Sequence, residues 1–158
     1  MEKAIKKFLR KYPASYPFSF ISFKPKEPIE VLWWGVQKET TIIDKSGKEK
    51  EVIQLLVFDG KDKKFKIITT SARSLLEKLS EIEDENENEW NKGMASLIKI
   101  TQIKEQRLDK RFTTRYEVEK LENVFREIMG RKEEIGMAED IFLQGEEEAE
   151  EEPWVEVE

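Results

Sequence analysis

Apolar and polar residues alternate through several short stretches in the first half of the chain, a period of two that is typical of β-strands. The strands predicted in this way cover residues 17–24, 29–36, 52–60 and 64–70. Two prolines in residues 24–28 interrupt the backbone ladder, and Asp59-Gly60 is typical of a hairpin turn. Gly35, inside the second predicted strand, indicates a bulge or a tight bend. We therefore expect the second to fourth strands to form a meander.

Three segments instead carry apolar residues at helical spacing. Residues 3–12 predict an amphipathic helix, which Pro13 closes. A second helix is expected after Ser71, a predicted N-cap, and the polar segment 83–93 is expected to be a loop. The apolar positions of this helix are Leu75, Leu76, Leu79 and Ile82. A third stripe, which Gly130 would end, consists of Leu121, Val124, Phe125, Ile128 and Met129.

Strands over residues 97–103 and 112–119 follow the second helix, and a basic connection, residues 104–111, joins them. On the last strand one alternating set is expected to face the core, namely Phe112, Thr114, Tyr116 and Val118. Strands with one helix before the last pair are typical of a Greek-key barrel of the OB type. The predicted fold class is mainly β with α, in which this small barrel is followed by a C-terminal helix and an acidic, disordered tail.

This pattern divides the chain into four parts. They are an N-terminal amphipathic helix (1–16), an OB-fold nucleic-acid-binding domain (17–120), a C-terminal helical segment (121–144) and an acidic tail (145–158). The third stripe is expected to pack on the barrel, with a partner or dimer helix as the alternative, so the protein is expected to be a monomer or a weak homodimer.

Composition removes several kinds of chemistry. The chain has no Cys and no His, which excludes disulfides, thiolate nucleophiles and the usual general base near neutral pH. Charged residues make up 39% of the chain, and this excess of Lys and Glu is typical of thermophilic proteins. No apolar run is long enough for a transmembrane helix and no secretory signal is evident, so an intracellular, cytoplasmic protein without membrane partners is expected.

Charge is distributed unevenly along the chain. Residues 1–120 carry 25 Lys/Arg against 20 Asp/Glu, whereas residues 121–158 carry 3 against 14. A basic body with an acidic tail indicates a nucleic-acid surface or an interaction tail. No glycine-rich phosphate loop is present, and the acidic segment 83–89 departs from the pattern of a calcium-binding loop. We therefore expect no catalysis, no metal and no cofactor.

Binding of single strands requires cations for the phosphates and aromatic faces on which bases stack. The candidate cations are Lys64 and Lys66 on the fourth strand, Arg107, Lys110 and Arg111 in the basic connection, and Arg115, which alternation places on the outer face. Trp33 and Trp34 lie on opposite faces of one strand, so at least one is expected to leave the core. Further candidates for stacking are Phe23 and Trp90.

The segment LIKITQIKEQRLDKRFTTRYEVE (97–119) resembles the closing hairpin of OB-fold single-stranded DNA-binding proteins from bacteriophages and from archaeal viruses and plasmids. SARSLLEKL (71–79) and residues 17–36 resemble the helix and the entry strand of that family. The resemblance implies sequence-independent binding of single-stranded DNA in replication or recombination. It also implies that the acidic tail binds partner proteins, with Trp154 and Val155 as the anchor, or competes with DNA for the body. A protein-interaction module and a single-stranded RNA-binding protein are the alternatives.

Overall fold

The computed structural model of the chain describes residues 4–5 and 18–144. Of the N-terminal segment only Ala4 and Ile5 are described, and both are helical. The rest of the predicted helix over residues 3–12 and the acidic tail from 145 to 158 lie outside the described residues. The described part is mainly β, with an open mixed sheet and two α-helices.

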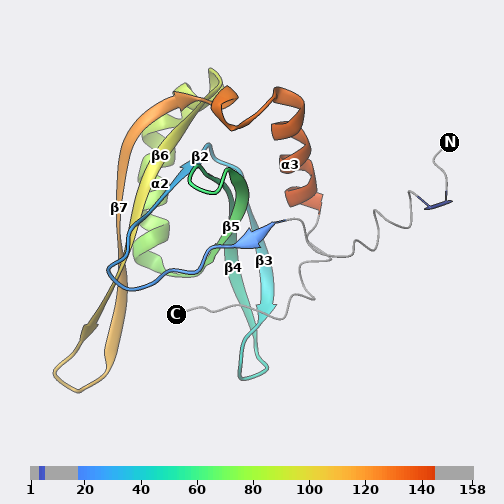
Figure 1. Cartoon of the computed structure of the whole chain (residues 1–158). Helices are drawn as coiled ribbons and strands as arrows, with labels where there is room; N and C mark the ends of the chain where they lie inside the picture. Colours follow the sequence, from blue (N-terminus) through green and yellow to red (C-terminus); the bar gives the residue numbers. More distant parts are fainter. Residues whose placement is uncertain (1–3, 6–17, 145–158) are drawn as a thin grey trace.

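The sheet has seven strands, and their order is β1-β5-β4-β2-β6-β7, with β3 paired to β4 (Figure 1). The strands are β1 (Ser19–Phe20), β2 (Ile29–Trp33), β3 (Gln37–Ile43), β4 (Glu49–Asp59), β5 (Lys64–Thr70), β6 (Met94–Gln106) and β7 (Phe112–Phe125). β1 pairs with β5 in parallel and the other strand pairs are antiparallel, which makes the sheet mixed. The predicted meander is confirmed, with β3 as an additional strand.

The bend at Gly35 explains how one continuous segment serves two partners. β2 pairs with β6 from Ile29 to Trp33, whereas β3 pairs with β4 along its whole length. Gly35 lies between them at φ 98°, and a Cβ there would lie 3.2 Å from ring atoms of Trp90. Both the conformation and the space therefore require glycine. β3 was not predicted, because its sequence QKETTII is mostly polar.

The β6–β7 hairpin is longer than the pattern predicted. Its pairing continues to Met94↔Phe125, so the stripe from Leu121 to Met129, predicted to be helical, is strand as far as Phe125. A short 3₁₀ helix, η1 (Arg126–Met129), follows, and then α3 (Lys132–Gln144). The helix predicted over this stripe is wrong because a register shift leaves Leu121 as an extra residue in β7. At such a bulge the alternation of apolar residues shifts by one position, so strand residues can be spaced like those of a helix.

α2 (Arg73–Asn91) includes most of the segment that was expected to be a loop. Its buried stripe continues from Ile82 to Asn86 and Trp90. Asn86 can be buried because its polar atoms have partners. Its amide donates to the Ile82 carbonyl oxygen (2.8 Å), and its oxygen accepts from Asn123 (3.1 Å). The helix begins without a side-chain cap, so the expected capping by Ser71 is wrong. Ser74 instead accepts the backbone N–H of Tyr116 on β7 (3.0 Å).

The two helices bury opposite faces of the sheet. Trp33 contacts Trp90 of α2, with 5.1 Å between ring centroids. The next residue, Trp34, points to the other face and donates to Glu139 of α3 (2.6 Å). Residues of both faces, including Leu75 of α2 and Phe142 of α3, belong to one buried cluster. The face of the sheet to which Trp34 points is thus covered by α3, which the sequence pattern did not predict.

The strands that the structure describes form an open mixed sheet. Residues 18–25 nevertheless run from one part of the sheet to another. Ser19 pairs with Lys66 on β5, and Pro25 forms a parallel bridge to Gln102 on β6.

Candidate nucleic-acid interface

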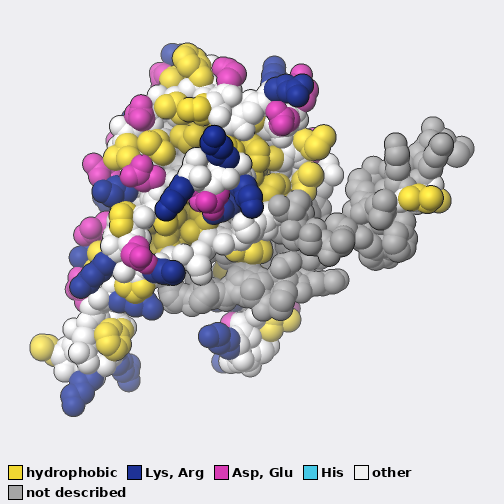
Figure 2. Space-filling view, viewed as in Figure 1, with side chains coloured by type: hydrophobic (Ala, Val, Ile, Leu, Met, Phe, Trp, Pro, Cys, Tyr) yellow, Lys and Arg dark blue, Asp and Glu magenta, His cyan; other side chains and the backbone are white. Residues whose placement is uncertain are grey.

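The β6–β7 hairpin projects from the body and carries a basic tip (Figure 1). Between residues 104 and 115 there are five Lys/Arg and two Asp/Glu. Arg107, Lys110 and Arg111 are all exposed, as predicted. Figure 2 shows Lys/Arg side chains gathered with hydrophobic ones at this tip. We call these three cations with Leu108 and Phe112 the hairpin tip.

A tight turn holds the three cations together. The Arg107 amide donates to the Arg111 carbonyl oxygen (2.6 Å), and the Lys110 amide donates to the Arg107 carbonyl oxygen (2.9 Å). Asp109 accepts the Arg111 amide through its carboxylate (3.0 Å). Lys110 adopts φ 67°, the left-handed conformation that ends a three-residue hairpin loop. The turn thus fixes the backbone positions of the three cations, and their side chains extend from it into solvent.

Apolar side chains at the tip are exposed as well. Leu108 is fully exposed, and Phe112 is 68% exposed. The prediction that Phe112 faces the core is wrong, because β7 begins beyond the reach of the packed body. Tyr116, four residues further along the same face, is buried as predicted. Phe112, which follows Arg111 in the chain, therefore presents an exposed aromatic ring at the tip.

Arg115 lies on the outer face as predicted, but carboxylates hold it. Its guanidinium lies 3.0 Å from Glu105 and 2.9 Å from Glu117. The hydrogen bond to Glu117, followed by the one to Glu105, raises the pKa of Arg115 above its ordinary value. Binding of a phosphate by Arg115 would first require release of these partners.

The two lysines of β5 differ in their availability. Lys64 is exposed, whereas Lys66 pairs with Asp59 (2.8 Å) and Asp62 (2.5 Å). The hydrogen bond to Asp59 raises the pKa of Lys66. Burial acts to raise the pKa of Asp59, but the hydrogen bond from Lys66 and a backbone hydrogen bond outweigh it and lower that pKa. Lys66 is therefore part of a structural cluster, and Lys64 is the cation that β5 offers to a ligand.

The three tryptophans of the described chain are buried. Trp33 and Trp34 are both less than a tenth exposed, so the expectation that one leaves the core is wrong. Trp90 lies in α2 and not in a loop, and its indole N–H donates to Ser96 (2.8 Å). Phe23 is half-buried with its ring edge-on to Tyr116, 5.2 Å away. None of these three described tryptophan rings offers a base an open face.

A second hairpin, between β3 and β4, reaches toward the same end of the molecule as the hairpin tip (Figure 1). Its turn carries the exposed cations Lys45 and Lys48. Asp44 closes the turn by accepting from the Ser46 hydroxyl (2.6 Å) and the Lys48 amide (3.0 Å). The hydrogen bond from Ser46 is the main reason why the pKa of Asp44 is lowered. That this turn and the hairpin tip lie at the same end of the molecule is a property of the assembled fold.

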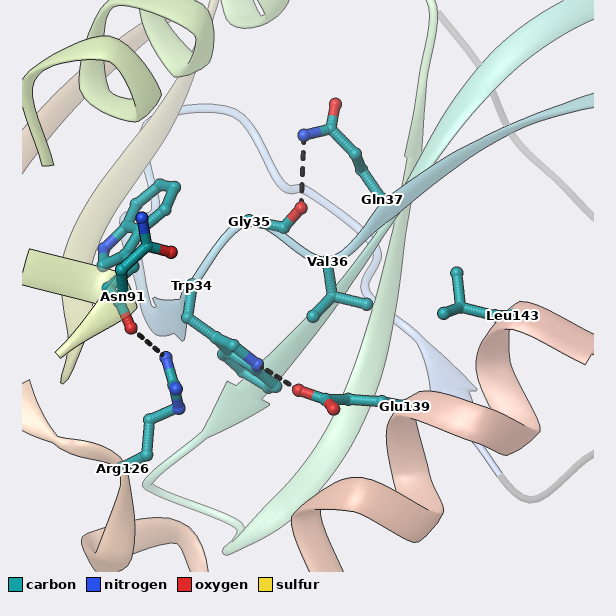
Figure 3. A pocket seen from close by; sticks show the side chains of 9 residues that line it. Trp34, Gly35, Val36, Gln37, Asn91, Arg126, Glu139 and Leu143 are labelled. Carbon is teal, nitrogen blue, oxygen red and sulfur yellow. Dashed lines mark hydrogen bonds between the residues drawn. The ribbon is translucent and has the colours of Figure 1, made fainter. Parts of the chain in front are cut away.

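A pocket of about 460 Å³ lies where the β2–β3 bend, the end of α2, η1 and α3 meet (Figure 3). Its polar groups are largely used within the protein. Arg126 donates to the carbonyl oxygens of Trp90 (2.9 Å) and Met94 (2.8 Å), and Glu139 accepts from Trp34. These contacts join η1 to α2 and α3 to β2, which indicates a structural junction.

In the part of the chain that the structure describes, no group of three His, Cys, Asp or Glu side chains could hold a metal ion. No helix described in the structure has the length and apolarity needed to cross a bilayer. The predicted partner anchor, Trp154 and Val155, lies outside the described residues. Comparisons with protein-family models, curated proteins and solved structures gave no match for this chain.

Proposed function

We propose that the protein binds single-stranded DNA without catalysis, in replication or recombination. The observation that carries the proposal is the hairpin tip, where the exposed cations Arg107, Lys110 and Arg111 lie in the turn that leads into the exposed Phe112. Single-strand binding combines cations that follow the phosphates with aromatic rings on which bases stack. Both occur together at this projecting turn.

The finer fold that we propose is an OB-type barrel. The strand order along the chain, with α2 before the last two strands, supports it. Further support comes from residues 18–25, which pair with β5 at one end and with β6 at the other. In the proposed barrel, a segment paired in this way at both ends would close the sheet.

In the proposed complex the strand runs over the end of the molecule to which both hairpins point. Phosphates contact the hairpin tip and Lys45 and Lys48 of the second hairpin, and a base stacks on Phe112. Lys64 pairs in the sheet with Asp59 at the other end of β4 and lies off this path. Contacts with phosphates and base faces carry little sequence information, so the binding is sequence-independent. The buried tryptophans support the scaffold, and partner binding through Trp154 and Val155 stays a prediction.

A matched pair of triple variants tests the proposal by fluorescence anisotropy with labelled oligo-dT at several salt concentrations. One variant removes the tip cations, Arg107→Gln, Lys110→Gln and Arg111→Gln. The control removes three exposed cations elsewhere, Lys78→Gln, Lys92→Gln and Lys132→Gln, and so has the same net charge. Each phosphate contact contributes about 0.7 to the slope of log affinity against log salt. The tip variant is therefore expected to lose about 2 from this slope, and the control to lose little.

Phe112→Ala, compared with Phe112→Tyr, tests the stacking. Loss of one base–aromatic contact costs about 1–3 kcal/mol, which corresponds to roughly 5- to 150-fold weaker binding, whereas tyrosine retains a stacking face. Equal affinity of wild type and the tip variant, or no binding of oligo-dT at low salt, would overturn the proposal. Equally tight binding of oligo-U would make RNA the alternative ligand, and a preference for duplex would contradict single-strand binding.

A further inference from the structure

The outer face of α3 carries apolar side chains that nothing described in the structure covers. Met137 is 63% exposed and Ile141 is 38% exposed, one helical turn apart. The opposite side of the same helix is buried through Ile135, Ala138 and Phe142. α3 is thus apolar on two sides, although one side is sufficient to attach a helix to the sheet.

Charge beside this face restricts what can cover it. Exposed carboxylates of Glu133, Glu134 and Asp140 flank Met137 and Ile141. A second copy of α3 would bring these acids against their equivalents, and like charges in contact are unfavourable. The face instead fits an amphipathic helix with a basic polar side. Such a helix would bury the apolar pair and place its cations near the carboxylates.

The chain contains a segment of this kind at its N-terminus. Residues 3–12 have Ile5, Phe8, Leu9 and Tyr12 at helical spacing. The same segment carries five cations and no acid: Lys3, Lys6, Lys7, Arg10 and Lys11. Ala4 and Ile5 are helical, and Ile5 is 74% exposed, so its apolar side chain lacks cover. The apolar and charged residues of this segment complement those of α3.

The N-terminal segment is also within reach of α3. Ser19 pairs with Lys66, whose neighbour Phe65 has its ring 6.2 Å from the ring of Trp34. Trp34 in turn contacts Glu139 of α3, so the chain enters the sheet close to this helix. Residues 13–17 span up to about 17 Å when extended. A ten-residue helix is about 15 Å long, which is close to the length of α3.

We propose that residues 3–12 dock as a helix on the Met137–Ile141 face of α3 of the same chain. The docked helix buries apolar residues on both partners, and its Lys and Arg side chains lie near Glu133, Glu134 and Asp140. α3 is then held between this helix and the sheet. This docking does not require DNA binding.

The absence of cysteine from the chain makes disulfide trapping a direct test. Phe8→Cys is combined with Met137→Cys in one variant and with Ile141→Cys in another. A third combines Phe8→Cys with Leu108→Cys at the hairpin tip, an apolar position that is more exposed than Met137 or Ile141 and lies away from α3. After oxidation of dilute full-length protein, intrachain disulfides are counted by mass spectrometry. Because docking raises the effective concentration of the two thiols, the α3 pairs are expected to close at least about fivefold faster than the control.

Charge reversal within the same cysteine pairs separates docking from simple proximity. Lys6→Glu, Lys7→Glu and Arg10→Glu are expected to lower the yield to that of the control. The yield is expected to return when Glu133→Lys, Glu134→Lys and Asp140→Lys are added. Equal rates for the α3 and control pairs, or a charge reversal without effect, would overturn the proposal. Disulfides that form mainly between two chains would show that a second copy is the occupant and would also overturn it.

Discussion

At the residue scale, position in the sequence did not separate cations that are free to bind from cations that hold the fold. Lys64 and Lys66 alternate on one strand and have the same chemistry, yet Lys66 pairs with Asp59 and Asp62 while Lys64 extends into solvent. The carboxylates come from the end of β4 and from the turn between β4 and β5. This turn, and not β5, decides the role of Lys66.

The Lys66 cluster predicts a pH window for stability. The pKa of Asp59 is lowered from 3.8, so its contribution is present above that pH and is lost as pH falls through the lowered value. The pKa of Lys66 is raised from 10.5, so its contribution is present below that pH and is lost as pH rises through the raised value. Asp59→Asn is expected to cost roughly 1 kcal/mol between these limits. Urea unfolding at pH 7 and at pH 2.5 checks this.

The cost of Asp59→Asn is expected to shrink at pH 2.5, because the stabilisation by a carboxylate with a lowered pKa decreases once the pH falls below the ordinary value of 3.8. Glu49→Gln, at an exposed position of the same strand, serves as the control and is expected to change stability little at either pH. An equal cost of Asp59→Asn at both pH values would show that the ion pair is not the cause.

At the scale of elements, the period of the pattern identified most strands and the main helix but not where they end. Segment 83–93 was interpreted as a loop because it is polar, yet Asn86 and Trp90 continue the buried stripe of α2. A buried asparagine is recognisable only when its partners, Ile82 and Asn123, are in view. Similarly, a bulge at Leu121 made a strand look helical. These element ends depend on tertiary contacts, which the spacing of apolar residues along the chain does not reveal.

The hairpin tip yields a prediction at this scale. Lys110 adopts φ 67°, which costs a non-glycine residue about 1–2 kcal/mol, whereas glycine loses about 0.5–1 kcal/mol of chain entropy. Lys110→Gly is therefore expected to stabilise the protein by roughly 0.5–1 kcal/mol in thermal unfolding. Lys110→Ala removes the same charge without relieving the strain, and is expected to give no gain. Equal melting temperatures for the two variants would contradict this.

At the scale of the whole molecule, two helices on opposite faces explain how adjacent tryptophans can both be buried. The sequence indicated correctly that Trp33 and Trp34 face opposite ways. It did not indicate that α3 returns to the second face, because the residues that meet there are far apart in the chain: Trp34 and Glu139, or Lys38 and Phe142. The candidate cations at the hairpin tip could be selected from sequence, since they needed no packing partner. Phe112 was missed because the projection of the hairpin is a property of the assembled fold.

The second covered face predicts that α3 is integral to stability. Phe142 is fully buried, and the Lys38 ammonium lies 4.6 Å from the centre of its ring. Phe142→Ala is expected to reduce the free energy of unfolding by about 3–5 kcal/mol in urea titration. Its neighbour Leu143 is 49% exposed, and Leu143→Ala is expected to cost much less. Similar small costs for both variants would indicate that α3 is only loosely attached.

The bulge at Leu121 bears on how copies of the protein would share one DNA strand. β7 forms one edge of the described sheet, and a long uninterrupted edge can template pairing with another chain. Here the extra residue breaks the ladder, and Ser74 occupies the backbone N–H of Tyr116. Pairing between two copies through the β7 edge is therefore disfavoured. Under the proposed function, copies bound to one strand would not be joined through β7 into a continuous filament, and each could dissociate separately.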